Sequence, residues 1–309
     1  MTHTEITFAS GDDQCAAWHF AAADDALAGP AGRPVVVMAH GLGGTKDSGL
    51  APFAEGLAAA GLDVLAFDYR GFGASGGEPR QTVSIARQVD DYRAAMAAAA
   101  RLPGVDPRRL VLWGVSVSGG HVLETGAGRD DVVAVVSITP LVSGAAAGRL
   151  ALAHHKKSAI LRSTVAGLRS KLGSKVGGPV MMPIVARPGE FGAMTLDGAY
   201  EAYTAMAGPT WRNEIDAAIG LELGGLRPGR FAKDLTCPLF VQIADFDRSA
   251  PPQATAKAAF KGRAQVRHYP SDHFDIWPGG DQFDAVLAHQ VAFLRRVLAP
   301  APAEKPAAV

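Results

Sequence analysis

The stretch from Leu110 to Val122 constrains the fold more than any other part of this chain. It reads Leu-Val-Leu-Trp-Gly-Val-Ser-Val-Ser-Gly-Gly-His-Val, so a short apolar run meets a turn of small residues. The pattern predicts a strand over 110–113, a tight turn, and a helix from His121 to Gly126. A serine on such a turn is held in a strained conformation, where bulky neighbours would collide with the closely packed helix. The stretch therefore predicts a strand, turn and helix unit that presents a nucleophilic serine.

Two serines compete for that position. The chain departs from the pattern G-x-S-x-G, because the residue two after Ser116 is Ser118 and not glycine. Choosing Ser116 keeps Gly114 in its place and leaves Ser118 as a small residue that can pack closely. Choosing Ser118 puts a serine where the first small residue belongs. We favour Ser116, and the alternative is a glycine- and serine-rich turn without chemistry.

The first 140 residues alternate strand-like and helix-like segments. Residues 5–10 and 14–20 predict a hairpin. The continuous apolar runs at 35–39, 62–67 and 132–138 are typical of strands buried on both faces. Helices are expected over 48–60 and 82–101. This alternation favours an α/β fold with a mostly parallel, doubly wound sheet.

The pattern changes after Pro140. Residues 141–232 contain no obvious buried strand, and their helix-like pieces (144–172, 198–207, 214–223) predict a helical cap inserted over one end of the sheet. Strand and helix alternation resumes at 238–244, 252–260 and 265–269 and ends in a helix over 281–298. We thus expect a core made of 1–140 and 233–298, the cap 141–232, and a disordered tail, 299–309.

Composition narrows the class of protein. With 309 residues, 48% of them hydrophobic, the chain can bury a sizeable core, and its net charge of +0 argues against nucleic acid or an anionic membrane as partner. There is no visible signal peptide and no run near the ~18 apolar residues of a spanning helix. The distant cysteines Cys15 and Cys237 fit reduced thiols in a cytoplasmic protein. Metal-ligand and nucleotide-binding motifs are missing from the sequence, so no metal and no cofactor are expected.

A serine hydroxyl needs a base and an orienting carboxylate, which on such a sheet follow later strands in the order acid, then histidine. The strand ending at residue 244 is followed by Asp245 and Asp247, and both remain candidates on this reasoning. His273 follows the last strand and is the expected base. Its neighbours Asp272 and Asp275 are interpreted as loop-shaping residues. The pair His154-His155 stands in a basic stretch that predicts a solvated helix face.

An acyl transfer also needs backbone N–H donors for the oxyanion. The residue after the nucleophile, Val117, supplies one, and the loop after the strand at 35–39 should supply the other. The glycines Gly41, Gly43 and Gly44 in that loop would let its backbone approach a substrate.

These motifs together resemble the α/β-hydrolase superfamily, in its esterase and serine-aminopeptidase-like branch. The resemblance rests on the elbow, the His40-Gly41 turn, the segment Asp68-Tyr69-Arg70-Gly71-Phe72-Gly73-Ala74-Ser75, and Asp247 and His273, and it covers about 1–140 and 233–298. It implies the α/β-hydrolase fold. It also favours Asp247 as the acid, since the family's acid commonly stands four residues before a proline, here Pro251. Leu42 is implied as the second oxyanion donor, His40 as structural, and Arg70 and Ser75 as loop braces.

The sequence thus predicts a serine hydrolase that cleaves a carboxylic ester through Ser116, His273 and Asp247, with Leu42 and Val117 as the oxyanion hole. Peptidase, thioesterase, lactonase or acyltransferase activity with the same triad, or a non-catalytic binding protein, are the alternatives. The expected partner is a small acyl substrate, and a homodimer is possible. Residues that bind the substrate stay unassigned, although large cap side chains could either line a cavity or pack on the core: Met181, Met182, Phe191, Met194, Tyr200, Tyr203, Met206 and Trp211.

Overall fold

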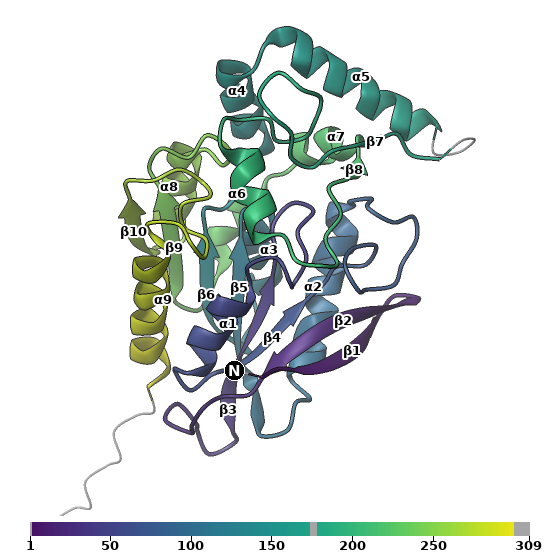
Figure 1. Cartoon of the computed structure of the whole chain (residues 1–309). Coiled ribbons are helices and arrows are strands. Elements are labelled where there is room, and N and C mark those ends of the chain that lie inside the picture. The colour runs from purple at the N-terminus through teal and green to yellow at the C-terminus, as the bar shows by residue number, and fades with distance from the viewer. Residues whose placement is uncertain (1, 174–177, 300–309) are drawn as a thin grey trace, which may run out of the picture.

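The computed structural model describes residues 2–173 and 178–299 of the chain. Its centre is an eight-stranded sheet in the order β1-β2-β4-β3-β5-β6-β9-β10 (Figure 1). Within the sheet β2 pairs antiparallel with both neighbours, and the remaining pairs are parallel. The strands are β1 (Thr4–Ser10), β2 (Asp13–Phe20), β3 (Arg33–Ala39), β4 (Asp63–Phe67), β5 (Val105–Val115), β6 (Val132–Ile138), β9 (Leu239–Ala244) and β10 (Gln265–Tyr269). The expected mostly parallel sheet is confirmed.

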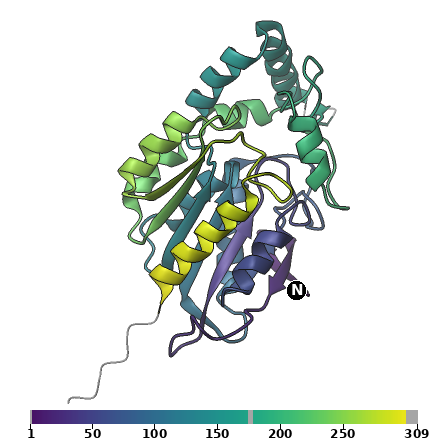
Figure 2. The same ribbon diagram turned by 60° about the vertical axis from the view of Figure 1, so that its left-hand side comes forward.

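Helices cover both faces of the sheet, which explains why its inner strands are apolar at every position. In β3, Val35 and Val37 belong to the core on one face, and Val36 and Met38 to the core on the other, all with no exposed surface. Figure 2 shows α9 and α1 lying together over the second of these faces. The helices are α1 (Ala51–Ala58) and α9 (Phe283–Leu298) on that face and α2 (Ile85–Ala99), α3 (Val117–Gly126) and α8 (Pro252–Lys261) on the other.

One prediction in the core needs correction. The helix after the turn begins at Val117, directly after Ser116, and not at His121. Glycine makes this early start possible, because a Cβ on Gly119 would lie 2.9 Å from the Pro140 Cβ and one on Gly120 2.7 Å from the Leu141 carbonyl oxygen. The first turn of α3 therefore packs onto the chain that leaves β6, which fixes the position of the serine.

The segment 141–232 lies over the carboxyl ends of the parallel strands (Figure 1). Its predicted first helix is in fact two helices, broken at His155 and Lys156, and a two-residue strand pair that was not expected joins the segment's middle to its end. Its elements are α4 (Gly144–His154), α5 (Lys157–Gly173), β7 (Met181–Met182), α6 (Ala199–Met206), β8 (Ile215–Asp216), α7 (Ile219–Gly224) and the 3₁₀ helix η1 (Pro228–Asp234).

Beyond Ala299 the predicted disordered tail lies outside the described residues. Between residues 2 and 299, leaving aside 174–177, no helix combines the length and the apolar character needed to cross a bilayer.

Candidate active site

Ser116 stands at the point where β5 passes into α3. Its backbone has φ 57° and ψ −117°, a conformation that costs a non-glycine residue about 1–3 kcal/mol. The neighbouring chain holds it there, since the Ser116 amide donates to the Ile138 carbonyl at 2.9 Å. Gly114 is required beside it, because a Cβ at that position would lie 2.3 Å from the Ser118 carbonyl oxygen. A strained serine on a rigid frame is the geometry of a nucleophile elbow.

Ser118, the competing serine, is fully buried and already engaged. Its Oγ accepts a hydrogen bond from the Val115 amide at 2.8 Å and lies 2.8 Å from the Ala39 carbonyl oxygen, to which it donates. It thereby ties the elbow to the end of β3. Ser116 is half-buried, and its Oγ makes no hydrogen bond to any residue that the structure describes. These contacts support Ser116 as the reactive serine and give Ser118 a structural role.

His273 and Asp247 form a buried pair. The Nδ1 of His273 lies 2.7 Å from Asp247 Oδ2, and both residues are 4% exposed. The other carboxylate oxygen, Oδ1, accepts from the amides of Ser249 at 2.7 Å and Ala250 at 2.6 Å. Both carboxylate oxygens are therefore engaged, and Nε2 is the ring nitrogen left to exchange a proton.

The rejected acids have other partners. Asp245 lies 2.6 Å from the Nδ1 of His268 in an exposed pair. Asp272 accepts from the Arg248 Nε at 2.6 Å and from the His273 amide at 2.7 Å. Asp275 accepts from the Asp272 amide at 2.8 Å. The last two aspartates shape the histidine loop, as the sequence led us to expect.

Burial alone would lower the pKa of His273, because an imidazolium ion loses its hydration in the interior. The charge of Asp247, its hydrogen bond to the ring and the charge of Asp272 outweigh that effect. The pKa of His273 is consequently raised above its ordinary value, so the carboxylate stabilises the protonated form that a general base becomes during reaction.

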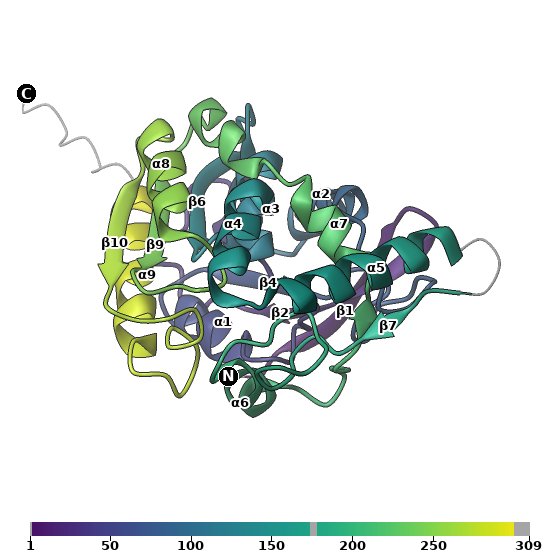
Figure 3. The same cartoon turned by 90° about the horizontal axis from the view of Figure 1, so that it is seen from above.

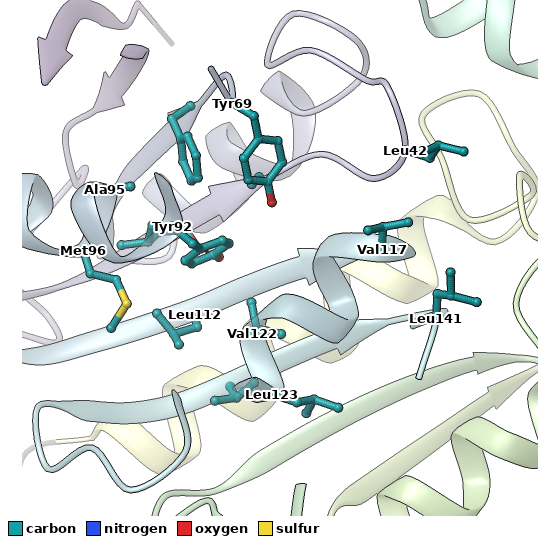
Figure 4. Packing of buried hydrophobic residues seen from close by; sticks show 14 of the residues in the cluster. Leu42, Tyr69, Tyr92, Ala95, Met96, Leu112, Val117, Val122, Leu123 and Leu141 are labelled. Atoms are coloured by element: carbon teal, nitrogen blue, oxygen red, sulfur yellow. The ribbon is translucent and has the colours of Figure 1, made fainter. Parts of the chain in front are cut away.

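Two buried amides, those of Leu42 and Val117, lack a hydrogen-bond partner among the residues that the structure describes. Val117 opens α3, where amides have no intrahelical acceptor. Leu42 lies in a turn closed by the Gly44 amide and the Gly41 carbonyl at 3.4 Å. Figure 4 shows both residues at the same end of the sheet. Free, buried donors at this place suit the oxyanion of an acyl transfer.

Sequence reasoning named Tyr203 only among the large side chains that could line a cavity or pack on the core, yet this residue contacts the loop that carries Leu42. Its hydroxyl donates to the Leu42 carbonyl at 3.0 Å, and its ring stacks on Trp211 at 5.1 Å between centroids. A tyrosine in a helix-like segment carries no signal of such a contact. His40, expected to be structural, stacks on Trp277 at 4.7 Å, and burial lowers its pKa to about 4.

Arg70 and Ser75 brace their loop as the resemblance implied. The Arg70 amide donates to Asp91 at 3.0 Å, and Ser75 Oγ donates to the Asp68 carbonyl at 2.7 Å. The Asp68 carboxylate is in turn paired with Lys46 Nζ at 2.8 Å. These polar groups hold the loop and do not line the cavity at Ser116.

A cavity of about 250 Å³ opens at Ser116. Leu42 and Val117 line it on the core side, with Arg248 and Ser249 from the loop that carries Asp247. The cap side comes from α4 and α7 and includes His155, which was predicted on a solvated face but is half-buried here. Of the large cap side chains, Met194 lines this cavity, whereas Tyr203 and Met206 pack on the core.

Comparison with known proteins places this geometry in context. A family model described as serine aminopeptidase, S33, matches residues 30–271. The quorum-quenching protein AidA of Acinetobacter baumannii is 35% identical over 298 residues, which cover 95% of each chain. The thiohydrolase aneE of Aspergillus aculeatus is 27% identical over 281 residues, 88% of each chain.

Solved structures share the fold of this chain at lower sequence identity. The α/β hydrolase GrgF from Penicillium sp. sh18 superposes with a TM-score of 0.77 at 21% identity, over 97% of this chain and 100% of that one. DcsB, solved with a substrate analogue, superposes with a TM-score of 0.76 at 20% identity over the same shares. These likenesses confirm the fold expected from the sequence.

Proposed function

The chain belongs to the serine aminopeptidase S33 family of α/β hydrolases, and from this premise we propose that it cleaves a carboxylic ester through an acyl-enzyme on Ser116. The observation that carries the proposal is a strained serine beside two amides, none of which has a hydrogen-bond partner among the described residues, with a buried imidazole and carboxylate on later loops. A hydrolase of this family whose serine stands in such a setting has the groups that acyl transfer requires.

In the proposed reaction, His273 Nε2 takes the Ser116 proton as Oγ attacks the acyl carbon. Asp247 keeps the Nδ1 proton in place and stabilises the imidazolium. The amides of Leu42 and Val117 bind the oxyanion. His273 then protonates the departing alcohol, and a water activated by the same nitrogen hydrolyses the acyl-enzyme. Hydrogen bonds between a catalytic base and its nucleophile are often long or poorly aligned before substrate binds, so the absence of one from Ser116 Oγ among the described residues does not argue against His273 as the base.

The segment 141–232 is proposed to act as a cap that shapes the acyl pocket and excludes water. Its support is the cavity itself, which has Ser116 on one wall and α4 and α7 on the other. A small acyl compound is the proposed partner.

Labelling with a fluorophosphonate tests the nucleophile. We expect the wild type to be labelled and Ser116→Ala not to be, while Ser118→Ala keeps its label. Absence of label on the folded wild type would contradict the proposal and favour a binding protein on this fold.

The leaving group is tested separately. A panel of p-nitrophenyl esters, acyl thioesters, lactones and aminoacyl anilides should give the highest kcat/KM on the esters. The thioester is the second candidate, because one relative across 88% of the chain is a thiohydrolase. Preference for thioesters over matched oxygen esters would replace the ester proposal with that one.

A further inference from the structure

A second cavity, of about 260 Å³, lies within the cap. It is lined by α4, α5 and α7 and by the chain near residue 193. Figure 3 shows these three helices gathered over the sheet. Four residues line both this cavity and the one at Ser116: Ala151, His155, Ala193 and Gly220. Because this shared boundary is built from a glycine, two alanines and one histidine, little side-chain volume separates the two spaces.

The volumes of the two cavities show why their shared boundary matters. Pockets for small molecules measure about 300–1,000 Å³. The cavity at Ser116, about 250 Å³, and the one in the cap, about 260 Å³, each fall below that range. Joined, they fall within it. A ligand that fills both would be long, because it must pass between α4 and α7.

Glycines along this path keep it open. A Cβ added to Gly148, Gly220 or Gly224 would meet no atom within 4 Å, so packing does not demand glycine there. These three glycines line the cavity at Ser116 and are solvent-exposed, so the groove between α4 and α7 is open on one side. Gly144 differs, since its Cβ would lie 1.9 Å from the Leu223 carbonyl oxygen. A glycine in a helix costs about 0.5–1 kcal/mol relative to alanine, a cost that packing explains only at Gly144.

Most other side chains on the path are apolar. Leu141, Met194 and Leu223 line the part near Ser116, and Ile160, Met182 and Leu221 line the part in the cap. The polar side chains are Arg248 and Ser249 at the serine end, His155 at the boundary, and a group in the cap: Arg162, Ser163, Thr164, Glu190 and Thr195. Such walls suit a hydrocarbon chain better than a sugar or a peptide.

We propose that the two cavities form one acyl channel, and that the substrate class is esters of extended, mainly apolar carboxylic acids. The acyl chain would run from Ser116 through the groove between α4 and α7 into the cap. This inference rests on the proposed function, because it assigns the acyl side of the same reaction.

Two variants narrow the boundary. Gly220→Leu and Ala151→Leu add bulk where both cavities meet, and Gly220 has no positive φ that would strain leucine. Ala145→Leu is the matched control, since Ala145 is exposed on α4 and lines neither cavity. Melting temperatures show whether each variant folds.

The assay is kcat/KM on p-nitrophenyl esters from acetate to dodecanoate. We expect both boundary variants to lose at least about tenfold on dodecanoate and to stay within about twofold on acetate, with the control unchanged. Unchanged dodecanoate hydrolysis in both folded variants, or an equal loss on acetate, would overturn the channel.

Binding separates this inference from the proposed function. Calorimetry with free dodecanoate on Ser116→Ala needs no catalysis, and we expect binding that is lost when Gly220→Leu is added. Binding by Ser116→Ala together with a wild type that hydrolyses no ester would refute the esterase and leave the channel standing. No binding in Ser116→Ala would refute the channel.

Discussion

Replacing Asp247 with asparagine changes one atom in a fully hydrogen-bonded group, so its effect can be worked out from contacts. Asp247 Oδ1 accepts from two backbone amides, at 2.7 and 2.6 Å, which cannot turn away. The NH₂ group of the asparagine side chain must therefore take the place of Oδ2, 2.7 Å from His273 Nδ1. Because that group donates, Nδ1 becomes an acceptor and the ring proton moves to Nε2. The histidine is then in the wrong tautomer to accept a proton from Ser116.

The size of the loss follows from this tautomer change. In serine hydrolases the same exchange of carboxylate for amide lowers kcat on the order of 10⁴-fold, which corresponds to about 5 kcal/mol of transition-state stabilisation. The fold should persist, because the two backbone amides keep their acceptor. The loss of the negative charge that raises the pKa of His273 should also move the acid limb of any residual activity to lower pH.

The measurement is kcat/KM on a p-nitrophenyl ester for Asp247→Asn beside Asp245→Asn. Asp245 is the matched control, because its carboxylate is exposed and pairs with His268. We expect Asp245→Asn to remain within about threefold of the wild type, as exposed pairs contribute little. Activity of Asp247→Asn within about tenfold of the wild type, or a loss confined to Asp245→Asn, would refute the assignment.

Three further predictions follow from the site. The pKa of His273 is raised, and only its neutral form is a base. As the pH is lowered, kcat/KM should therefore fall with a midpoint above the ~6.5 of an ordinary histidine. A midpoint below that value would contradict the role of Asp247 in raising the pKa of His273. Tyr203→Phe removes the hydrogen bond to the Leu42 carbonyl and should lower kcat about tenfold at nearly constant KM. This loss is smaller than the ~10²-fold cost of removing an oxyanion donor itself. Tyr200→Phe is the control, and equal effects of the two variants would refute a positioning role for Tyr203. Ser118→Ala removes the acceptor of a buried amide and should lower the free energy of unfolding by about 1–3 kcal/mol in urea titrations, whereas an unchanged midpoint would show that its bonds do not support the elbow.

The strands of the sheet could be predicted from the sequence because the burial of a strand shows in the polarity of consecutive residues. A strand buried on both faces must be apolar at consecutive positions, so the run at 132–138 predicted the bounds of β6 as the structure has them. Helix ends were less accurate. The helix expected over 82–101 spans Ile85–Ala99, since Ser84 caps it and accepts from the Arg87 amide at 3.5 Å.

The core part of the candidate site was accessible for a related reason. Parallel strands deliver their following loops to one edge of the sheet, so the order of Ser116, Asp247 and His273 along the chain implied that they would meet. The structure brings Asp247 and His273 into contact and places the loop of Asp247 on the cavity of Ser116. The order of residues along the chain could not decide between Asp245 and Asp247 as the acid, because both follow β9. Their contacts distinguish them, since Asp247 pairs with His273 and Asp245 pairs with His268.

The cap was harder to predict because its residues are small and its contacts are distant in sequence. Gly148 and Gly220 lie in helices, as the helix-like pieces 144–172 and 214–223 predicted, but a Cβ on either would meet no described atom within 4 Å. These glycines leave room for a ligand between α4 and α7. The sequence does not show this room, because it depends on how the two helices lie relative to each other. Tyr203 is the converse case, since its partner Leu42 lies 161 residues away. In the proposed reaction, substrate selection therefore depends on the part of the sequence that carries the fewest motifs, whereas the chemistry depends on the part that carries the most.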